Sequence, residues 1–155
     1  MSLFVECKPD ETLASALGIS RREVEHAGNR AGVCKQVSSK SDTTGMVDED
    51  PETAPLPYMK TMVEKIAEHQ LRVLFDAKRN NRLVVICPRL EDWLVQTAKI
   101  AGLKMTDFGF ESDNGRQLHG QINHRLENLD RLVRKLLLDK NARILLLQKL
   151  ISQCK

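Results

Sequence analysis

The sequence predicts an α/β fold, namely a small, doubly wound, largely parallel sheet with helices on both faces, followed by C-terminal helices. Two observations predict this fold. In the first part of the 155-residue chain, short apolar runs alternate with helical segments, as in strand–helix–strand units. From Gly115 onward, apolar residues recur at the spacing of an amphipathic helix. We expect an α/β domain over residues 1–110 and a helical extension over residues 111–155 that packs on the same domain.

The first half of the chain is expected to hold three strands and two helices. Short apolar, β-prone runs predict the strands, and glycine or proline marks helix starts and stops. Asp10 suits the N-cap of the first helix. In order, the expected elements are strand 3–7, helix 11–17, strand 23–26, a glycine-containing turn at 27–32, helix 33–37, a polar loop at 38–42 and strand 44–47.

The second half is expected to add two strands and several helices. A solvent-facing loop over residues 51–57 precedes a helix over residues 58–70, whose apolar residues fall on one face. Strands follow over residues 71–75 and 83–87, joined by a basic connection, and Pro88 then begins a helix. The C-terminal apolar stripe consists of Leu118, Ile122, Leu126, Leu129, Val133 and Leu136, with a further segment over residues 144–151.

The composition is ordinary for a soluble globular protein, with 41% hydrophobic and 29% charged residues. No stretch approaches the roughly 18 apolar residues of a membrane span, and the N-terminus lacks a signal-peptide pattern. The cysteines are scattered without the paired spacing of a zinc site, which favours free thiols in a reducing compartment. We therefore expect a cytoplasmic protein without a membrane partner. The cysteines are Cys7, Cys34, Cys87 and Cys154.

Charge is distributed unevenly, although the net charge is only +3. It is −4 over residues 1–57, +3 over residues 58–110 and +4 over residues 111–155. An acidic segment beside basic ones suits metal-assisted chemistry on a polyanion such as nucleic acid. Basic helix surfaces are, however, commonly just solvated faces.

A row of carboxylates ends the third expected strand. Val47 is followed by Asp48, Glu49, Asp50 and Pro51, and because side chains alternate along a strand, Asp48 and Asp50 are expected to point the same way. Adjacent like charges need a cation or protons to neutralise them, and Mg²⁺ takes one or two carboxylates while keeping several waters. The motif therefore predicts a magnesium site, while an acidic turn before a proline-rich loop explains the same residues.

Two further carboxylates are expected at the same edge of the sheet. Glu6 directly follows the apolar run Leu3–Val5, and ligands of open α/β sheets bind at the carboxyl ends of the strands. Glu6 and Asp48 can meet there if their strands are close in the sheet. Glu91, in the first turn of the helix that Pro88 begins, is expected to face this edge, although a negative charge there also suits the helix dipole.

Glycines between the second strand and the second helix suggest a contact with phosphate. In residues 27–32, the glycines could let backbone amides approach a phosphate, with Arg30 or Lys35 nearby. Lys8 is the third residue that we expect to bind phosphate. A tight turn with close helix packing explains the same glycines.

Together these motifs resemble the Toprim domain. The segment Val5–Asp10 resembles its opening motif, a strand-end glutamate followed four residues later by an acidic residue. The segment Gly45–Asp50 resembles its second motif, two aspartates separated by one residue at the end of a later strand. The order of elements is also similar, over about residues 3–95. The segment Pro88–Trp93 is closer to the pattern of small, stand-alone Toprim-like proteins.

The resemblance implies a nuclease-like protein that transfers phosphoryl groups on nucleic acid with Mg²⁺, or with Mn²⁺ in its place. It gives Glu6 the role of general acid/base and gives Asp48 and Asp50 the role of holding the ion. Asp10 and Glu91 are additional members of the acidic site, Glu91 by inference from its position more than from the family.

The chain departs from the family pattern at three positions. Cys7 stands where glycine usually follows the first glutamate, and Pro51 follows the paired aspartates directly. No catalytic tyrosine can be placed, because Tyr58 is the sole tyrosine and is expected in a linker. Strand passage and primer synthesis are therefore not expected of this chain alone, and phosphodiester hydrolysis remains.

Two other functions stay open. One is a non-enzymatic interaction module that keeps the fold and uses its C-terminal helices for assembly. The other is a phosphatase or nucleotide-binding protein of flavodoxin-like architecture, for which the chain carries no phosphate-loop or dinucleotide fingerprint. The long C-terminal stripe predicts a homodimer contact, or else helices that complete one monomeric core.

Overall fold

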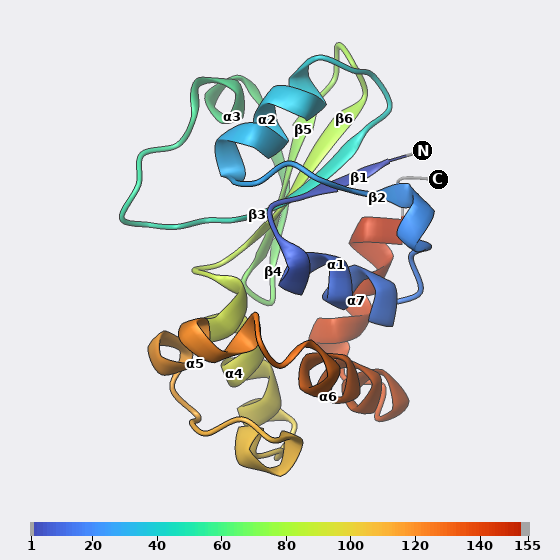
Figure 1. Cartoon of the computed structure of the whole chain (residues 1–155). Coiled ribbons are helices and arrows are strands. Elements are labelled where there is room, and N and C mark those ends of the chain that lie inside the picture. Colours follow the sequence, from blue (N-terminus) through green and yellow to red (C-terminus); the bar gives the residue numbers. More distant parts are fainter. Residues whose placement is uncertain (1, 153–155) are drawn as a thin grey trace.

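The computed structural model describes residues 2–152, and Met1 and residues 153–155 lie outside the described part. Its six strands form one sheet in the order β2-β1-β3-β6-β5-β4, with helices on both faces (Figure 1). The strands are β1 (Leu3–Val5), β2 (Val24–His26), β3 (Thr44–Asp48), β4 (Val63–Glu68), β5 (Leu71–Asp76) and β6 (Asn81–Ile86). The helices are α1 (Lys8–Ala16), α2 (Arg30–Ser38), α3 (Pro57–Thr61), α4 (Leu90–Ile100), α5 (Gly115–Ile122), α6 (Leu126–Leu138) and α7 (Ala142–Ser152). The predicted α/β class is confirmed.

The sheet is mixed, with four parallel strands and an antiparallel edge. Strands β2, β1, β3 and β6 run parallel, whereas β5 pairs antiparallel with both β6 and β4. The connection between β5 and β6, residues 77–80, is too short for the crossover that parallel strands need, so these strands form a hairpin. The predicted strands 71–75 and 83–87 are thus confirmed.

The predicted helix over residues 58–70 is wrong. Only the single turn α3 is helical, and β4 follows it as an edge strand paired with β5. The apolar residues of this segment serve two faces of the sheet, because Met59 and Met62 pack on one core and Ile66 packs on the other. Val63 is 58% exposed. Their spacing imitated one helix face, and pairing with β5 decided the conformation.

Helix boundaries also differ from the prediction. Helix α1 begins at Lys8 with Cys7 as its N-cap, so Asp10 occupies the third helical position and not the cap. Pro9 fits in this first turn because the amide that it lacks would have no helical partner there. The C-terminal stripe is divided between α5 and α6, which are separated by residues 123–125.

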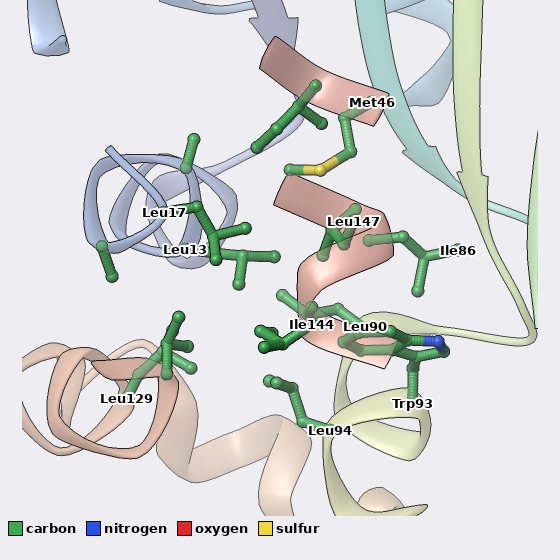
Figure 2. Packing of buried hydrophobic residues seen from close by; sticks show 14 of the residues in the cluster. Leu13, Leu17, Met46, Ile86, Leu90, Trp93, Leu94, Leu129, Ile144 and Leu147 are labelled. Atoms are coloured by element: carbon green, nitrogen blue, oxygen red, sulfur yellow. The ribbon is translucent and has the colours of Figure 1, made fainter. Parts of the chain in front are cut away.

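The sheet separates two hydrophobic cores. In β6, Leu83 and Val85 face the core formed with α2 and α3, whereas Val84 and Ile86 face the larger core formed with α1, α4, α6 and α7. Figure 2 shows this larger core, where Leu13 and Leu17 of α1, Met46 of β3, Trp93 of α4, Leu129 of α6 and Ile144 of α7 converge. The predicted helices on both faces of the sheet are therefore present.

A buried arginine ties α7 to α4. Arg143 is 6% exposed, and its guanidinium donates to Thr97 Oγ1 at 2.8 Å and to Gln70 Oε1 at 3.0 Å. The same group lies 5.0 Å from the centre of the Trp93 ring, a cation–π contact. These polar contacts fix where α7 lies on the larger core.

The C-terminal stripe is covered by the chain itself. Five of its six residues are buried and share the larger core with the sheet, and Leu126 is partly exposed. Residues 111–152 therefore pack on the α/β domain, and the stripe no longer argues for a homodimer. Within the described residues, no helix is long and apolar enough to cross a membrane. The buried members are Leu118, Ile122, Leu129, Val133 and Leu136.

The single larger core predicts that the C-terminal helices unfold together with the sheet. Leu129→Ala removes a fully buried side chain and is expected to lower the free energy of unfolding by about 2–5 kcal/mol. Leu138→Ala, on the same helix but at a side chain that is 77% exposed, should change it by less than about 0.5 kcal/mol. Urea unfolding followed by circular dichroism and by Trp93 fluorescence should give one coincident transition. Two separate transitions would contradict the shared core.

Candidate functional site

Among the parallel strands, the direction of strand addition reverses at β1. The chain passes from β1 to β2 on one side and then to β3 on the other side of β1. In open α/β sheets, the crevice outside the carboxyl ends of the two strands at such a point is the usual ligand site. Glu6 follows β1 and Asp48 ends β3, so both flank this crevice.

Two carboxylates accept backbone hydrogen bonds across the crevice. The amide of Asp48 donates to Glu6 Oε2 at 2.8 Å, and the amide of Leu90, the first residue of α4, donates to Asp48 Oδ1 at 3.1 Å. Asp48 therefore satisfies one of the free amides at the start of α4. Through these bonds, Glu6 and Asp48 link the ends of β1 and β3 to the start of α4.

Asp10, in the first turn of α1, is a third carboxyl group close to Glu6 and Asp48. Its Oδ2 accepts from the backbone amide of Cys7 at 3.2 Å and from Cys7 Sγ at 3.4 Å, which is the capping arrangement of α1. The residue is only 5% exposed. Its charge also reaches Asp48, whose pKa it raises.

Burial and mutual repulsion hold these carboxyl groups above their ordinary pKa values. Desolvation, followed by the charges of Asp10, Glu6 and Glu91, raises the pKa of Asp48 to about 8. Desolvation and the charge of Glu6 raise the pKa of Asp10 to about 7. Desolvation also raises the pKa of Glu6, against the hydrogen bond from Asp48 and the charge of Arg30. The groups titrate as one coupled set.

Glu91 belongs to this set by charge but points to a different partner. It is buried in the first turn of α4, and its Oε1 lies 3.1 Å from Nδ1 of His119 on α5. Beside this pair lies a hollow of about 360 Å³. The charged and imidazole groups that line it are Arg89, Arg116, His119, Glu52, Glu91 and Asp92.

Asp50 lies beyond the end of β3, so strand alternation does not extend to it. Its φ is +47°, in the left-handed region. Its carboxylate accepts from the hydroxyl of Thr53 and, at 3.2 Å, from Arg89. These bonds and the charge of Arg89 lower the pKa of Asp50. Its charge still raises the pKa of Glu6, but its side chain has partners different from those of Asp48.

The expected phosphate-binding residues do not form one group. Arg30 is buried, and its guanidinium donates to the carbonyls of Glu49 at 2.6 Å and Ala54 at 2.9 Å. Lys8 and Lys35 are exposed on α1 and α2. Arg30 therefore anchors the loop after β3, and its charge lowers the pKa of Glu6.

The segment predicted as a glycine turn is in part helical, because α2 begins at Arg30 and not at residue 33, and packing explains Gly32 in its first turn. A Cβ on Gly32 would lie 2.0 Å from the carbonyl oxygen of Ala27, so only glycine fits there. The side chain of Asn29 accepts from the Gly32 amide at 2.7 Å and thereby caps α2. The start of α2 already has a side-chain acceptor.

The donor chemistry at the crevice fits a hard cation such as Mg²⁺. Glu6, Asp48 and Asp10 supply carboxyl oxygens, and an ion would relieve the repulsion that raises their pKa values. Every buried side-chain nitrogen or oxygen in the described residues has a hydrogen-bond partner. No group of three or more His, Cys, Asp or Glu within residues 2–152 is arranged to hold an ion, so binding would require these side chains to turn.

The sequence reasoning missed two groups at this edge. Arg89 bonds Asp50 at 3.2 Å and lies 3.4 Å from Glu52, and His119 bonds Glu91. Arg89 lies within the segment Pro88–Trp93 and directly precedes α4, and this position was a usable signal. His119 is 28 positions from Glu91, and no spacing rule connects them.

The cysteines of the described residues have raised thiol pKa values, unlike reactive cysteines. Within the described residues, Cys7, Cys34 and Cys87 are free thiols, and Cys154 lies outside those residues. Burial raises the pKa of the Cys34 thiol to about 11 and that of Cys87 to about 12. Thiols in this state are poor nucleophiles at neutral pH.

Comparison of the chain with protein-family models, with curated proteins and with solved structures finds no match. The function must therefore be argued from the fold and the crevice.

The raised pKa values predict how stability depends on pH. The pKa of Asp48 is near 3.8 ordinarily and about 8 in the folded chain, so between these values the folded state binds more protons and the free energy of unfolding falls as pH rises. In Asp48→Asn this fall should be shallower, by up to about 1.4 kcal/mol per pH unit. Urea unfolding from pH 5 to pH 8 with a chelator present measures the slope.

The matched control for this experiment is Asp50→Asn. Its carboxyl has a lowered pKa, so the variant should keep the wild-type slope over the same pH range. Part of the slope should also survive in Asp48→Asn, because Asp10 contributes to it. Equal slopes in wild type and Asp48→Asn would contradict the coupling of the crevice carboxyl groups.

Proposed function

We propose that this protein is a Mg²⁺-dependent, nuclease-like enzyme that hydrolyses phosphodiesters of nucleic acid. The observation that carries the proposal is the meeting of Glu6 and Asp48 at the reversal point of the sheet, where the backbone amide of Asp48 donates a 2.8 Å hydrogen bond to the Glu6 carboxylate. Both side chains are half-buried, and carboxyl groups with raised pKa values that meet in a cleft are typical of functional sites.

In this proposal Asp48 holds the ion, with Asp10 and Glu6 as neighbouring carboxylates. Asp50 joins the ion only when its bond to Arg89 is released. When bound there, the ion would supply Lewis-acid polarisation of the phosphodiester and would stabilise the charge on the leaving or attacking oxygen. Mn²⁺ can replace Mg²⁺, since both prefer carboxylate and water oxygens.

Glu6 is the proposed general base. Desolvation raises its pKa from the ordinary value of 4.5, which brings the carboxylate closer to the basicity that proton transfer at neutral pH requires. Arg30 and the Asp48 amide oppose the shift, so the group stays able to accept a proton. Glu6 then takes a proton from the water that attacks phosphorus.

The basic residues that line the adjoining hollow support a polyanionic substrate. They are Arg89 and Arg116, whereas Lys8 and Lys35 are exposed on α1 and α2, on opposite faces of the sheet. The two arginines attract a phosphate backbone without reading its sequence. We include a cytoplasmic location in the proposal, consistent with the free thiols among the described residues.

The second candidate is a non-enzymatic interaction module. One observation favours it, namely that Glu6 and Asp48 already accept backbone amides while no three ligands in the described residues converge on an ion. In that case the carboxylates only hold the crevice together. The module would assemble through other surfaces, with a homodimer as the simplest product.

Metal binding and cleavage distinguish the two functions. At pH 8, millimolar Mg²⁺ or Mn²⁺ should raise the thermal midpoint of the wild type, because the ion binds the folded state, and Asp48→Asn should lose this shift. Glu6→Gln should lower the metal-dependent cleavage of DNA and RNA oligonucleotides by about 10²–10⁴-fold.

The charge-matched control is Asp107→Asn, an exposed carboxylate in the turn Met105–Phe108. It should keep both the metal shift and the cleavage. Cleavage that is equal in wild type and Glu6→Gln would identify a contaminant and reject the enzyme. Concentration-dependent sedimentation without cleavage would support the interaction module.

A further inference from the structure

The pair formed by Glu91 and His119 is not used by the function proposed above. The carboxylate of Glu91 is 10% exposed, whereas the imidazole of His119 is 74% exposed and lines the open hollow. The oxygen and Nδ1 are 3.1 Å apart. A carboxylate only accepts hydrogen bonds, so its partner nitrogen carries the proton. Nε2 is then the nitrogen left to exchange protons in the hollow.

Close packing of α5 on α4 holds the imidazole in this position. A Cβ on Gly115 would lie 2.2 Å from Asp92 Oδ1 and 3.1 Å from the Asp92 Cα. A larger residue at this position would displace the Asp92 side chain or move the start of α5 away from the first turn of α4. His119 is four residues after Gly115, on the same face of the helix. The contact at Gly115 therefore brings His119 over Glu91.

The hollow and the crevice adjoin through the first turn of α4, which contributes Leu90 to one and Glu91 to the other. Leu90, which donates its amide to Asp48, immediately precedes Glu91. The charge of Glu91 raises the pKa of both Glu6 and Asp48, so these groups lie within electrostatic range of one another. A phosphodiester held at the crevice would extend toward the hollow, where Arg89 and Arg116 offer cations to its oxygens.

We infer that His119 is the general acid that protonates the leaving oxygen, and that Glu91 is its positioning residue. This inference rests on the proposed phosphodiester hydrolysis. As the water oxygen bonds to phosphorus, Glu6 takes a proton from the water. The bond from phosphorus to the leaving oxygen breaks with its electron pair, and that oxygen takes the proton of His119 Nε2. The imidazole is left neutral, with its Nδ1 proton held by Glu91.

The test compares two substrates that differ in the leaving group. The leaving group of a dinucleoside phosphodiester is an alkoxide, which needs a proton. The leaving group of bis(4-nitrophenyl) phosphate is the stabilised 4-nitrophenolate anion, which does not. His119→Gln should lower kcat on the dinucleoside by about 10²–10⁴-fold, with KM unchanged, and should leave the nitrophenyl ester nearly unaffected. Glu91→Gln should show the same selectivity with a smaller loss. His124→Gln, at an exposed histidine after α5, should match wild type on both esters.

The outcomes separate the two proposals. A wild type that cleaves neither ester with Mg²⁺ or Mn²⁺ overturns the proposed function and the general acid with it. An active wild type in which His119→Gln slows both esters equally, or neither, overturns the general acid alone.

A nitrogen NMR measurement tests the pair without any catalysis. Neutral His119 should carry its proton on Nδ1 in the wild type, and this tautomer should lose its preference in Glu91→Gln. A wild-type imidazole protonated on Nε2 would overturn the inference even if cleavage is observed.

Discussion

The reversal of strand order at β1 is the constraint on which the rest of the structure depends. Because β2 and β3 lie on opposite sides of β1, the connections after β1 and β3 leave the sheet in different directions. Backbone amides at these ends would otherwise lack partners. Glu6 and Asp48 supply the acceptors, through bonds to the amides of Asp48 and Leu90. The carboxylates that hold the crevice together are thus the same groups to which the proposed function assigns the chemistry.

This double use has an energetic cost. Desolvation and mutual repulsion oppose ionisation of Asp10 and Asp48, whose pKa values rise to about 7 and about 8. Near neutral pH, the crevice therefore holds carboxyl groups that exchange protons readily. A bound proton relieves the same repulsion, and a cation would do so at the same oxygens.

The C-terminal helices do more than cover the sheet. Helices α6 and α7 complete the larger core, and the buried Arg143 fixes α7 against Trp93 and Thr97. Helix α5 has a different role, because it lies on the first turn of α4 and forms one wall of the hollow. The wall brings an exposed histidine next to a buried carboxylate, which neither segment could do alone.

The sequence by itself determined the strands and helices whose apolar pattern had one interpretation. Apolar runs ended by Glu6 and Asp48 predicted two strand ends at the carboxyl edge of the sheet, since parallel strands share that edge. The amphipathic stripe likewise predicted the C-terminal helices. In these cases the local pattern and the tertiary packing agree.

Only the tertiary structure decided the remaining features. Residues 63–68 form a strand because β5 offers an edge to pair with, although their spacing also suited a helix. Asp50 leaves the strand pattern because the backbone turns at a positive φ and Arg89 takes its carboxylate. His119 meets Glu91 because the contact at Gly115 brings α5 against α4. Sequence spacing reports neighbours along one element, whereas these partners belong to different elements that meet only when the core packs.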